Sequence, residues 1–317
     1  MRYYLSFDGG GTKLLGILFD GQYRILACAR ASGVNPTLHG AQEIRQNIRQ
    51  CVGQLLERSG CDIPAIQTAY ASQDSCYQEI IEEFVPCKGV HICGEGVLGV
   101  LTCGLTSGIC ALSGTGSDVF YIRDGSQVDV LGGWGYALGD PGSGHDIGRK
   151  ALELVVRQME GVRSPSILDE VIIGNCGLDT KAKLMPFIYN QPSPIHYVAS
   201  FCRSANLAAE RGDAEAREIL RAAGVTLARQ AILLMKKHQL TREIPFCTTG
   251  SVLRHCALVR SAFEETLREQ NPSAEIFYPI FEPVIGGLLY CMFQNGDAPG
   301  KTFYNALTQM CQSFQLI

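Results

Sequence analysis

The sequence predicts an α/β fold built from two similar halves. Apolar segments of strand length alternate along the chain with amphipathic segments of helix length. An apolar strand, a glycine-rich turn and a second apolar strand occupy residues 5–20, and the same order returns at residues 108–123. A hairpin that recurs after about a hundred residues suggests an internal repeat. The 317 residues are enough for two domains of ordinary size.

The first half is predicted to combine short strands with three helices. The segment 41–58 has helical spacing, because Ile44, Ile48, Val52 and Leu55 recur on one face. Glycine, proline and polar residues separate the other elements. We expect strands at 5–9, 14–20, 24–31, 66–71 and 89–93, and helices at 41–58, 76–84 and 97–103.

The second half begins with three strands of its own, and most of its middle is helical. We expect strands at 108–113, 118–123, 127–131, 244–249 and 274–280, and helices at 143–159, 164–173, 181–190, 195–211, 214–239, 252–269, 284–294 and 301–314. The predicted domains are residues 1–107, residues 108–300 with a helical insertion, and a C-terminal helix at 301–317 that packs back on the first domain.

Charge and composition favour a cytoplasmic protein that binds small molecules. The net charge of -4 arises from mixed signs without long blocks, so we expect no nucleic-acid partner and no membrane anchor. The N-terminus runs directly into a strand, and no apolar run approaches the length that spans a bilayer. The 14 cysteines are scattered and form no Cys-x-x-Cys pair, which favours buried reduced thiols over disulfides or structural zinc.

The turn of the first hairpin has the composition of a phosphate clamp. Successive glycines let the backbone approach a triphosphate, and the N–H groups of the turn can point at the anion. Asp8 ends a strand, where its carboxylate can hold Mg²⁺ through water while Thr12 and Lys13 reach the phosphates. An ordinary hairpin turn is the alternative, because Asp-Gly also favours it. The candidate residues are Asp8, Gly9, Gly10, Gly11, Thr12 and Lys13.

Four short motifs follow one another along the chain. They are Asp8-Gly9-Gly10-Gly11-Thr12, Ser113-Gly114-Thr115-Gly116-Ser117, Gly132-Gly133-Trp134-Gly135 leading to Gly139-Asp140, and Thr249-Gly250-Ser251. In this order they resemble the BadF/BadG/BcrA/BcrD ATPase family, specifically its N-acetylglucosamine kinase branch, over nearly the whole chain. The resemblance implies an actin-like ATPase fold, in which two ribonuclease-H-like domains enclose a cleft for ATP and substrate.

The resemblance also assigns the ATP contacts. It implies that the two glycine turns hold the phosphates from opposite sides, so that two sets of backbone donors neutralise the charge. The second turn supplies Gly114, Thr115, Gly116 and Ser117, and Gly250 and Ser251 lie by the nucleoside.

On the acceptor side the resemblance implies that Asn35, Gly132, Gly133 and Asp140 contact the sugar. Asn35 offers a donor and an acceptor, although Asn-Pro is also an ordinary turn. Asp140 can accept hydrogen bonds from hydroxyls, or alternatively cap the helix that begins near residue 143. We expect Trp134, the only tryptophan, to pack in the core beside these glycines.

The catalytic base is where the chain departs from the family. The kinase branch usually carries an aspartate after a short strand, and Glu95 matches that position here. Glutamate is one methylene longer, and the flanking glycines allow the backbone to retreat. The alternative is a helix-start glutamate that favours the helix dipole. Pro141, His145 and residues 72–74 also differ from the usual pattern on the acceptor side.

The sequence therefore predicts an ATP-dependent kinase that phosphorylates a hydroxyl of an N-acetylated amino sugar, N-acetylglucosamine or N-acetylmuramic acid. Its cofactors are ATP and Mg²⁺, and related proteins are often homodimers. Two alternatives stay open. One is an ATPase that activates a dehydratase through a shared iron–sulfur cluster, with Cys93, Cys103 and Cys110 as candidate ligands. The other is a sensor that binds ATP or sugar without turnover.

Overall fold

The computed structural model describes residues 1–191 and 193–317. The chain packs into two compact units. The first comprises Met1–Gly108, Ile122–Val128 and Phe277–Ile317, and the second comprises Ile109–Tyr121 and Asp129–Ile276. The predicted domain limits, residues 1–107, 108–300 and 301–317, stay a proposal, because a packing unit is not by itself a folding domain.

The first unit contains a mixed five-stranded sheet in the order β3-β2-β1-β4-β5. Antiparallel pairing joins β1 to β2 and β2 to β3, whereas β1, β4 and β5 run parallel. The carboxyl ends of the three parallel strands therefore meet at one edge of the sheet. The strands are β1 (Tyr3–Gly9), β2 (Lys13–Asp20), β3 (Ile25–Ser32), β4 (Ile66–Ala71) and β5 (Val90–Ile92).

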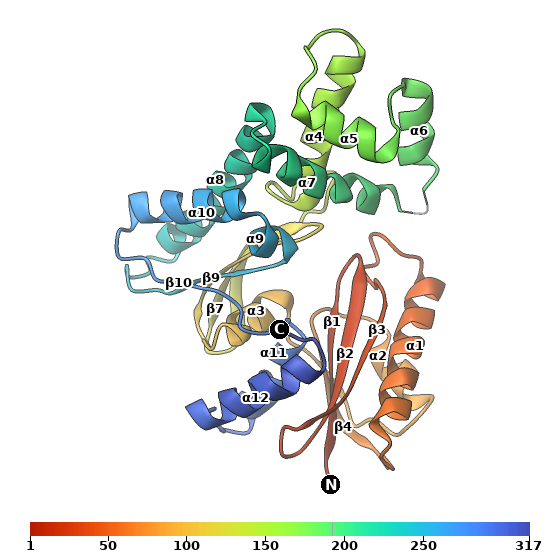
Figure 1. Cartoon of the computed structure of the whole chain (residues 1–317). Coiled ribbons are helices and arrows are strands. Elements are labelled where there is room, and N and C mark those ends of the chain that lie inside the picture. Colours follow the sequence, from red (N-terminus) through yellow and green to blue (C-terminus); the bar gives the residue numbers. More distant parts are fainter. Residues whose placement is uncertain (192) are drawn as a thin grey trace. The chain divides into compact units, whose positions relative to one another are not determined.

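Helices cover this sheet because each has an apolar face to bury. The predicted stripe of α1, from Ile44 to Leu55, is buried, and α1 packs on β2 and β3 (Figure 1). The helix α11 packs on β1, β4 and α3. The helices of this unit are α1 (Ala41–Ser59), α2 (Tyr77–Glu82), α3 (Glu95–Thr102), α11 (Ile285–Gln294) and α12 (Lys301–Ser313).

The second sheet repeats the order of the first, reading β8-β7-β6-β9-β10. Its central strand β6 runs parallel to β9, as β1 does to β4. The prediction of two similar α/β halves is thus confirmed. The strands are β6 (Gly108–Ser113), β7 (Ser117–Arg123), β8 (Ser126–Gly132), β9 (Phe246–Thr249) and β10 (Ile276–Phe277).

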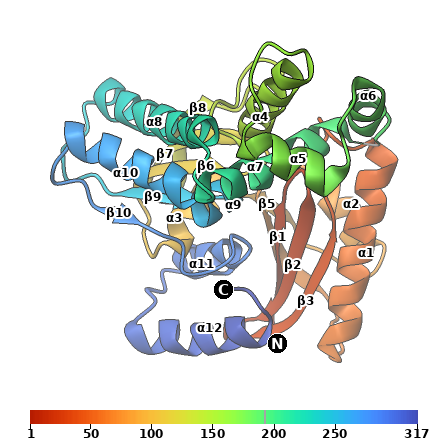
Figure 2. The same cartoon turned by 45° about the horizontal axis from the view of Figure 1, so that its top comes forward.

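The helical part of the second unit is built around α7 and α8. The helix α7 packs on α4, α5 and α8, and α8 packs along α10 (Figure 2). The helices are α4 (Gly144–Met159), α5 (Ile167–Cys176), α6 (Lys181–Tyr189), α7 (Pro194–Glu210), α8 (Ala214–Lys237), α9 (Ser251–His255) and α10 (Ala257–Gln270). In the described part of the chain, no helix has the length and apolarity that a bilayer crossing requires.

Two predicted elements are wrong in their extent. The single helix expected at 252–269 is broken at Cys256, whose extended backbone (ψ 93°) separates α9 from α10. The strand expected at 274–280 is reduced to Ile276–Phe277. Pro279 follows two residues later and has no N–H to continue the ladder.

Candidate functional site

The first glycine turn is held closed by backbone hydrogen bonds. The Gly10 N–H donates to the Lys13 carbonyl (2.9 Å), which connects β1 to β2. The Gly10 carbonyl in turn accepts the N–H of Val34 (3.0 Å). The Gly9 N–H donates to Ser72 Oγ (2.9 Å), so the end of β4 fixes the end of β1. This turn is therefore a supported loop, with Thr12 and Lys13 exposed to solvent.

Asp8 lies half-buried at the end of β1. Burial raises the pKa of its carboxyl to about 6; the charge of Lys13 opposes this rise and that of Glu282 adds to it. Lys13 Nζ itself is 2.8 Å from Glu282 Oε2. A cation beside Asp8 would offset the cost of burying the carboxylate, so the donor set fits Mg²⁺. No group of three or more potential ligands occurs in the described part of the chain.

Glu95 begins α3 at the same sheet edge. Its neighbour Gly94 adopts a positive φ of 87°, which turns the chain sharply after β5. The strand register pairs Phe7 with Ala71 and Ala71 with Ile92, so Glu95 follows the third of three adjacent strand ends. Glu95 is half-buried, and a carboxylate in the first turn interacts favourably with the helix dipole.

Asn35 stabilises its own turn. Its Oδ1 accepts the Thr37 N–H (2.9 Å) and the Thr37 hydroxyl (2.7 Å), and its carbonyl accepts the N–H groups of Leu38 and His39. The ordinary turn weighed from the sequence is present in this structure. Contact between Asn35 and a sugar stays a prediction.

The second glycine turn rests on the start of α4. The Gly114 N–H donates to the Gly116 carbonyl (2.9 Å), and the Gly144 N–H donates to the Gly114 carbonyl (2.8 Å). Ser117 Oγ donates to the Pro141 carbonyl (3.0 Å). The residues 114–117 are therefore joined to the Pro141 loop and to α4, which makes the turn a fixed backbone feature of the second unit.

The fourth motif, Thr249-Gly250-Ser251, lies against the second because Gly250 has no side chain. Gly250 follows β9 with a φ of 91°, and a Cβ placed on it would lie 2.3 Å from the Ser113 carbonyl oxygen. Only glycine allows the two backbones to approach so closely. Gly250 and Ser251 thus lie beside the end of β6, where the glycine turn begins.

Two carboxylates lie beside the glycines of this unit. Asp140 is buried with a positive φ of 57°, and its Oδ2 lies 2.8 Å from where a Cβ on Gly116 would stand. Asp118 Oδ1 lies 2.7 Å from the corresponding position on Gly133 and has no hydrogen-bond partner within residues 1–191 and 193–317. The cap of α4 is Ser143, whose Oγ accepts the Asp146 N–H, so Asp140 is not the cap.

Burial raises the pKa of both carboxyl groups. It raises the pKa of Asp118 to about 6, and the charge of Asp140 adds to the effect. It also raises the pKa of Asp140, against a hydrogen bond from the Gly135 backbone. Asp118 is not among the site residues predicted from the sequence. The signal that could have identified it is an acidic residue directly after the second glycine turn. Two perturbed carboxyl groups in one loop cluster are typical of a functional site.

Trp134 lies on the surface and not in the core, where it was predicted. Its side chain is 74% exposed, and Tyr136 and Leu138 of the same loop are also exposed. The expectation that Trp134 packs in the core is wrong, because Gly132 and Gly133 both have positive φ and carry the loop out of β8 toward solvent. The ring is accessible for stacking on a ligand.

The cysteines proposed as cluster ligands are buried. Cys93, Cys103 and Cys110 each lie in apolar surroundings, and burial raises the pKa of the Cys93 thiol to about 12. Metal-bound cysteine is a thiolate, which such a site disfavours. Every cysteine that the structure describes is a free thiol.

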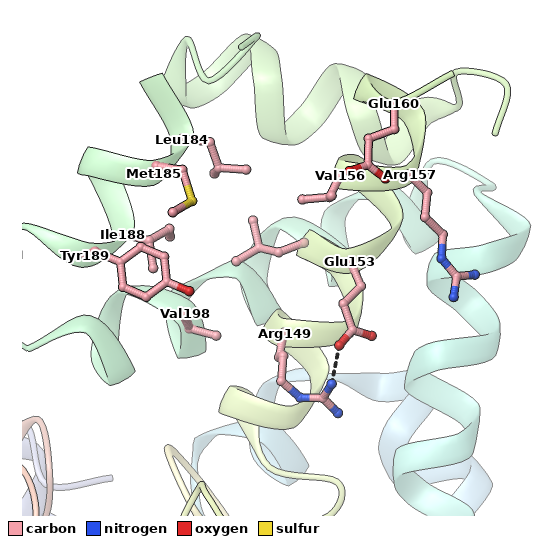
Figure 3. A pocket seen from close by; sticks show the side chains of 11 residues that line it. Arg149, Glu153, Val156, Arg157, Glu160, Leu184, Met185, Ile188, Tyr189 and Val198 are labelled. Atoms are coloured by element: carbon pink, nitrogen blue, oxygen red, sulfur yellow. Dashed lines mark hydrogen bonds and ion pairs between the residues drawn. The ribbon is translucent and has the colours of Figure 1, made fainter. Parts of the chain in front are cut away.

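The helical region contains a cavity of about 450 Å³ (Figure 3). Apolar side chains of α4 and α6 face one another across it, and the Arg149–Glu153 ion pair lies at one edge. Among the described residues that line it there is none of the predicted site residues. The cavity is therefore separate from the glycine motifs.

Three known proteins with similar sequences or folds carry the names of amino-sugar kinases. The chain is 25% identical to an N-acetylmuramic acid/N-acetylglucosamine kinase of Clostridium acetobutylicum over 87% of this chain and 94% of the relative. It is 23% identical to a glucosamine kinase of Vibrio cholerae over 80% and 85%. The solved structure of a putative N-acetylglucosamine kinase from Chromobacterium violaceum superposes with a TM-score of 0.71 at 24% identity, covering 91% of this chain and 98% of that one.

The fold of the solved structure agrees with the two repeated sheets described above. A family model matches residues 7–291, and this range includes all four motifs. The chain belongs to the BadF/BadG/BcrA/BcrD ATPase family.

Proposed function

We propose that this protein is an ATP-dependent kinase that phosphorylates a hydroxyl of an N-acetylated amino sugar, N-acetylglucosamine or N-acetylmuramic acid. The observation that carries the proposal is the sheet edge at which Gly9, Ser72 and Glu95 follow three adjacent strands. A phosphate-binding turn and a carboxylate base are the two parts that phosphoryl transfer to an alcohol requires. Relatives named as kinases for these sugars support the acceptor class.

Glu95 serves as the base in this proposal. Its carboxylate takes the proton of the acceptor hydroxyl as the oxygen forms a bond to the γ-phosphorus of ATP. The bond between that phosphorus and the β–γ bridging oxygen breaks, and ADP leaves with the electron pair. The half-buried position at the start of α3 favours the ionised form of the base through the helix dipole.

The glycine turns position the nucleotide. The Gly9–Lys13 turn and the Gly114–Ser117 turn present backbone donors to the phosphates, and Gly250 and Ser251 lie by the nucleoside. Asp8 would hold Mg²⁺, which supplies charge neutralisation on the phosphates when bound. How the two turns face each other across the expected cleft stays a prediction.

The acceptor is held by the loop between β8 and α4. We assign Gly132, Gly133 and Asp140 to the sugar, with Asn35 from the first unit. The exposed ring of Trp134 adds a surface on which a pyranose can stack. The homodimer expected from related proteins is part of the same proposal.

A free amino sugar is a second candidate acceptor, and a specific observation favours it. Half-buried Asp118 lies beside Gly132 and Gly133, buried Asp140 lies beside Gly116, and Asp118 Oδ1 lacks a partner within the described residues. A protonated amine would neutralise this pair, whereas an acetamido group would leave it uncompensated. One relative carries the name glucosamine kinase.

The test is ADP release from ATP and Mg²⁺ with N-acetylglucosamine, N-acetylmuramic acid and glucosamine in parallel. The leading proposal expects acceptor-dependent turnover highest for an N-acetylated sugar, and glucosamine as the best acceptor would favour the second candidate. If no acceptor stimulated ADP release while a sugar still raised the melting temperature, the protein would be a sensor. A brown, air-sensitive protein would instead favour the dehydratase activator.

Glu95→Gln tests the base directly. We expect kcat to fall about 10³-fold, because general-base catalysis is lost, while ATP binding is kept. The matched control is Glu79→Gln, since Glu79 also lies in the first turn of a short helix but pairs with Arg45 on the surface. Unchanged turnover in Glu95→Gln would exclude Glu95 as the base.

A further inference from the structure

His39 joins the phosphate-binding turn to the start of α1. Its Nε2 lies 2.7 Å from the Gly11 carbonyl oxygen, and its Nδ1 lies 2.9 Å from Glu43 Oε1. The imidazole side chain is only 10% exposed, whereas the Glu43 side chain is 52% exposed. His39 belongs to none of the four motifs, so neither the sequence pattern nor the proposed function gives it a role.

The contact with Gly11 determines which ring nitrogen donates. A carbonyl oxygen only accepts hydrogen bonds, so Nε2 must carry a proton. His39 therefore donates from Nε2 to the Gly11 carbonyl, while Nδ1 faces Glu43.

A close backbone approach makes this contact possible. A Cβ on Gly33 would stand 2.1 Å from the Gly11 carbonyl oxygen and 2.7 Å from His39 Nε2. The Gly33 carbonyl accepts a hydrogen bond from Asn47 Nδ2 of α1 (2.8 Å). The segment that carries Gly33 therefore lies between the tip of the turn and α1, and both sides of it are held by hydrogen bonds.

We propose that His39 is a positioning residue, whose Nε2–H donates to the Gly11 carbonyl and so holds the glycine turn in its phosphate-binding conformation. The proposal rests on the proposed function, because it requires that this turn binds ATP. By fixing the Gly11 carbonyl, His39 directs the N–H groups of the turn toward the anion.

Glu43 contacts the other nitrogen of the ring. Its Oε1 lies 2.9 Å from His39 Nδ1, and it belongs to the first turn of α1. The ring is therefore held between the glycine turn and the start of α1, which fixes its orientation toward the Gly11 carbonyl.

The donor nitrogen can be identified without nucleotide. In protein labelled with ¹⁵N-histidine, the resonances that disappear in His39→Gln belong to His39. We expect its Nε2 to show the shift of a nitrogen that carries a proton, because the Gly11 carbonyl can only accept. An Nε2 without a proton would overturn the proposal.

The clamp that His39 places on the Gly11 carbonyl is tested by the Kd of a non-hydrolysable ATP analogue with Mg²⁺ at pH 7. We expect His39→Ala to raise Kd about tenfold, as loss of the hydrogen bond to the Gly11 carbonyl implies. His39→Gln keeps a donor for Gly11, so its Kd should stay close to that of the wild type. A Kd for His39→Gln as high as that for His39→Ala would show that the donor is not what holds the turn.

Two glycine variants control for structural damage. Gly33→Ala inserts a methyl group into the clamp and should raise Kd as His39→Ala does. Gly40→Ala is the matched control, because it lies in the same segment with no atom within 4 Å of the added Cβ. If the wild type bound no nucleotide, the proposed function would fail and this inference with it. Bound nucleotide with an unchanged Kd in His39→Ala would overturn the inference alone.

Discussion

At the scale of single residues, the site is distinguished by carboxylates that are buried without full compensation. Burial raises the pKa of Asp8 and of Asp118 to about 6, and both residues lie at the base of a glycine turn. Burying a charged carboxylate is unfavourable unless a cation or a hydrogen-bond donor neutralises it. Carboxyl groups buried in this way are therefore typical of binding or catalytic sites. In the proposed function, a cation of the nucleotide complex would be the partner of Asp8, and the acceptor would be the partner of Asp118.

Asp118→Asn tests this cost. The raised pKa means that the folded state holds the Asp118 proton between its ordinary pKa of 3.8 and about 6, where the unfolded chain has released it. Stability therefore falls as pH rises through this window, and the substitution should reduce that fall. We expect the unliganded variant to gain about 1 kcal/mol at pH 7, after allowance for partial exposure. Urea unfolding at pH 4 and at pH 7 measures it, and an unchanged difference between the two pH values would contradict the assignment.

At the scale of elements, turns and close backbone contacts place the motifs. The hairpin of β1 and β2 was predictable because apolar alternation and Asp-Gly are local signals. The break at Cys256 and the shortened β10 were not, since each depends on how a segment packs on its neighbours. The contact between Gly250 and Ser113 is likewise not visible in the sequence, where the two residues lie far apart.

Gly250→Ala tests the junction between β6 and β9. The added Cβ would lie 2.3 Å from the Ser113 carbonyl oxygen, on a backbone with a φ of 91°. We expect a loss of about 3 kcal/mol in the free energy of unfolding, from strain and overpacking. Gly174→Ala is the control, because Gly174 is an exposed position in α5 with no atom within 4 Å of the new Cβ. That variant should gain about 0.5–1 kcal/mol from helix propensity. Equal stability of the two variants would show that the junction tolerates a side chain.

At the scale of the whole molecule, the chain is rich in cysteine, and the cysteines that the structure describes are free thiols. Most cysteines that the structure describes are buried in the two cores, Cys28 and Cys76 are half-buried, and Cys61 is exposed. Burial raises the pKa of the Cys51, Cys93 and Cys311 thiols to about 12, which keeps them protonated and unreactive at neutral pH. The preference for reduced thiols that the sequence suggested agrees with this distribution.

Thiol labelling of the native protein tests this distribution. Brief exposure to an alkylating reagent at pH 7, read out peptide by peptide in a mass spectrometer, should modify Cys61 first and leave Cys51 and Cys93 unmodified. Labelling in denaturant should reach all three at similar rates, because unfolding removes the burial that shields Cys51 and Cys93 and raises their pKa. Early modification of Cys93 in the native protein would show that its surroundings open readily.

The sequence by itself determined the repeated α/β architecture, the two glycine hairpins and the family. Those features depend on periodicity and on short motifs, which are properties of neighbouring residues. Only the tertiary structure decided that Asp118 lies at Gly132 and Gly133, that the charge of Asp140 acts on it, and that Trp134 is exposed. It also decided that His39 reaches Gly11. Such contacts join residues from separate elements, and packing and buried charge, which no local pattern encodes, determine which of them meet.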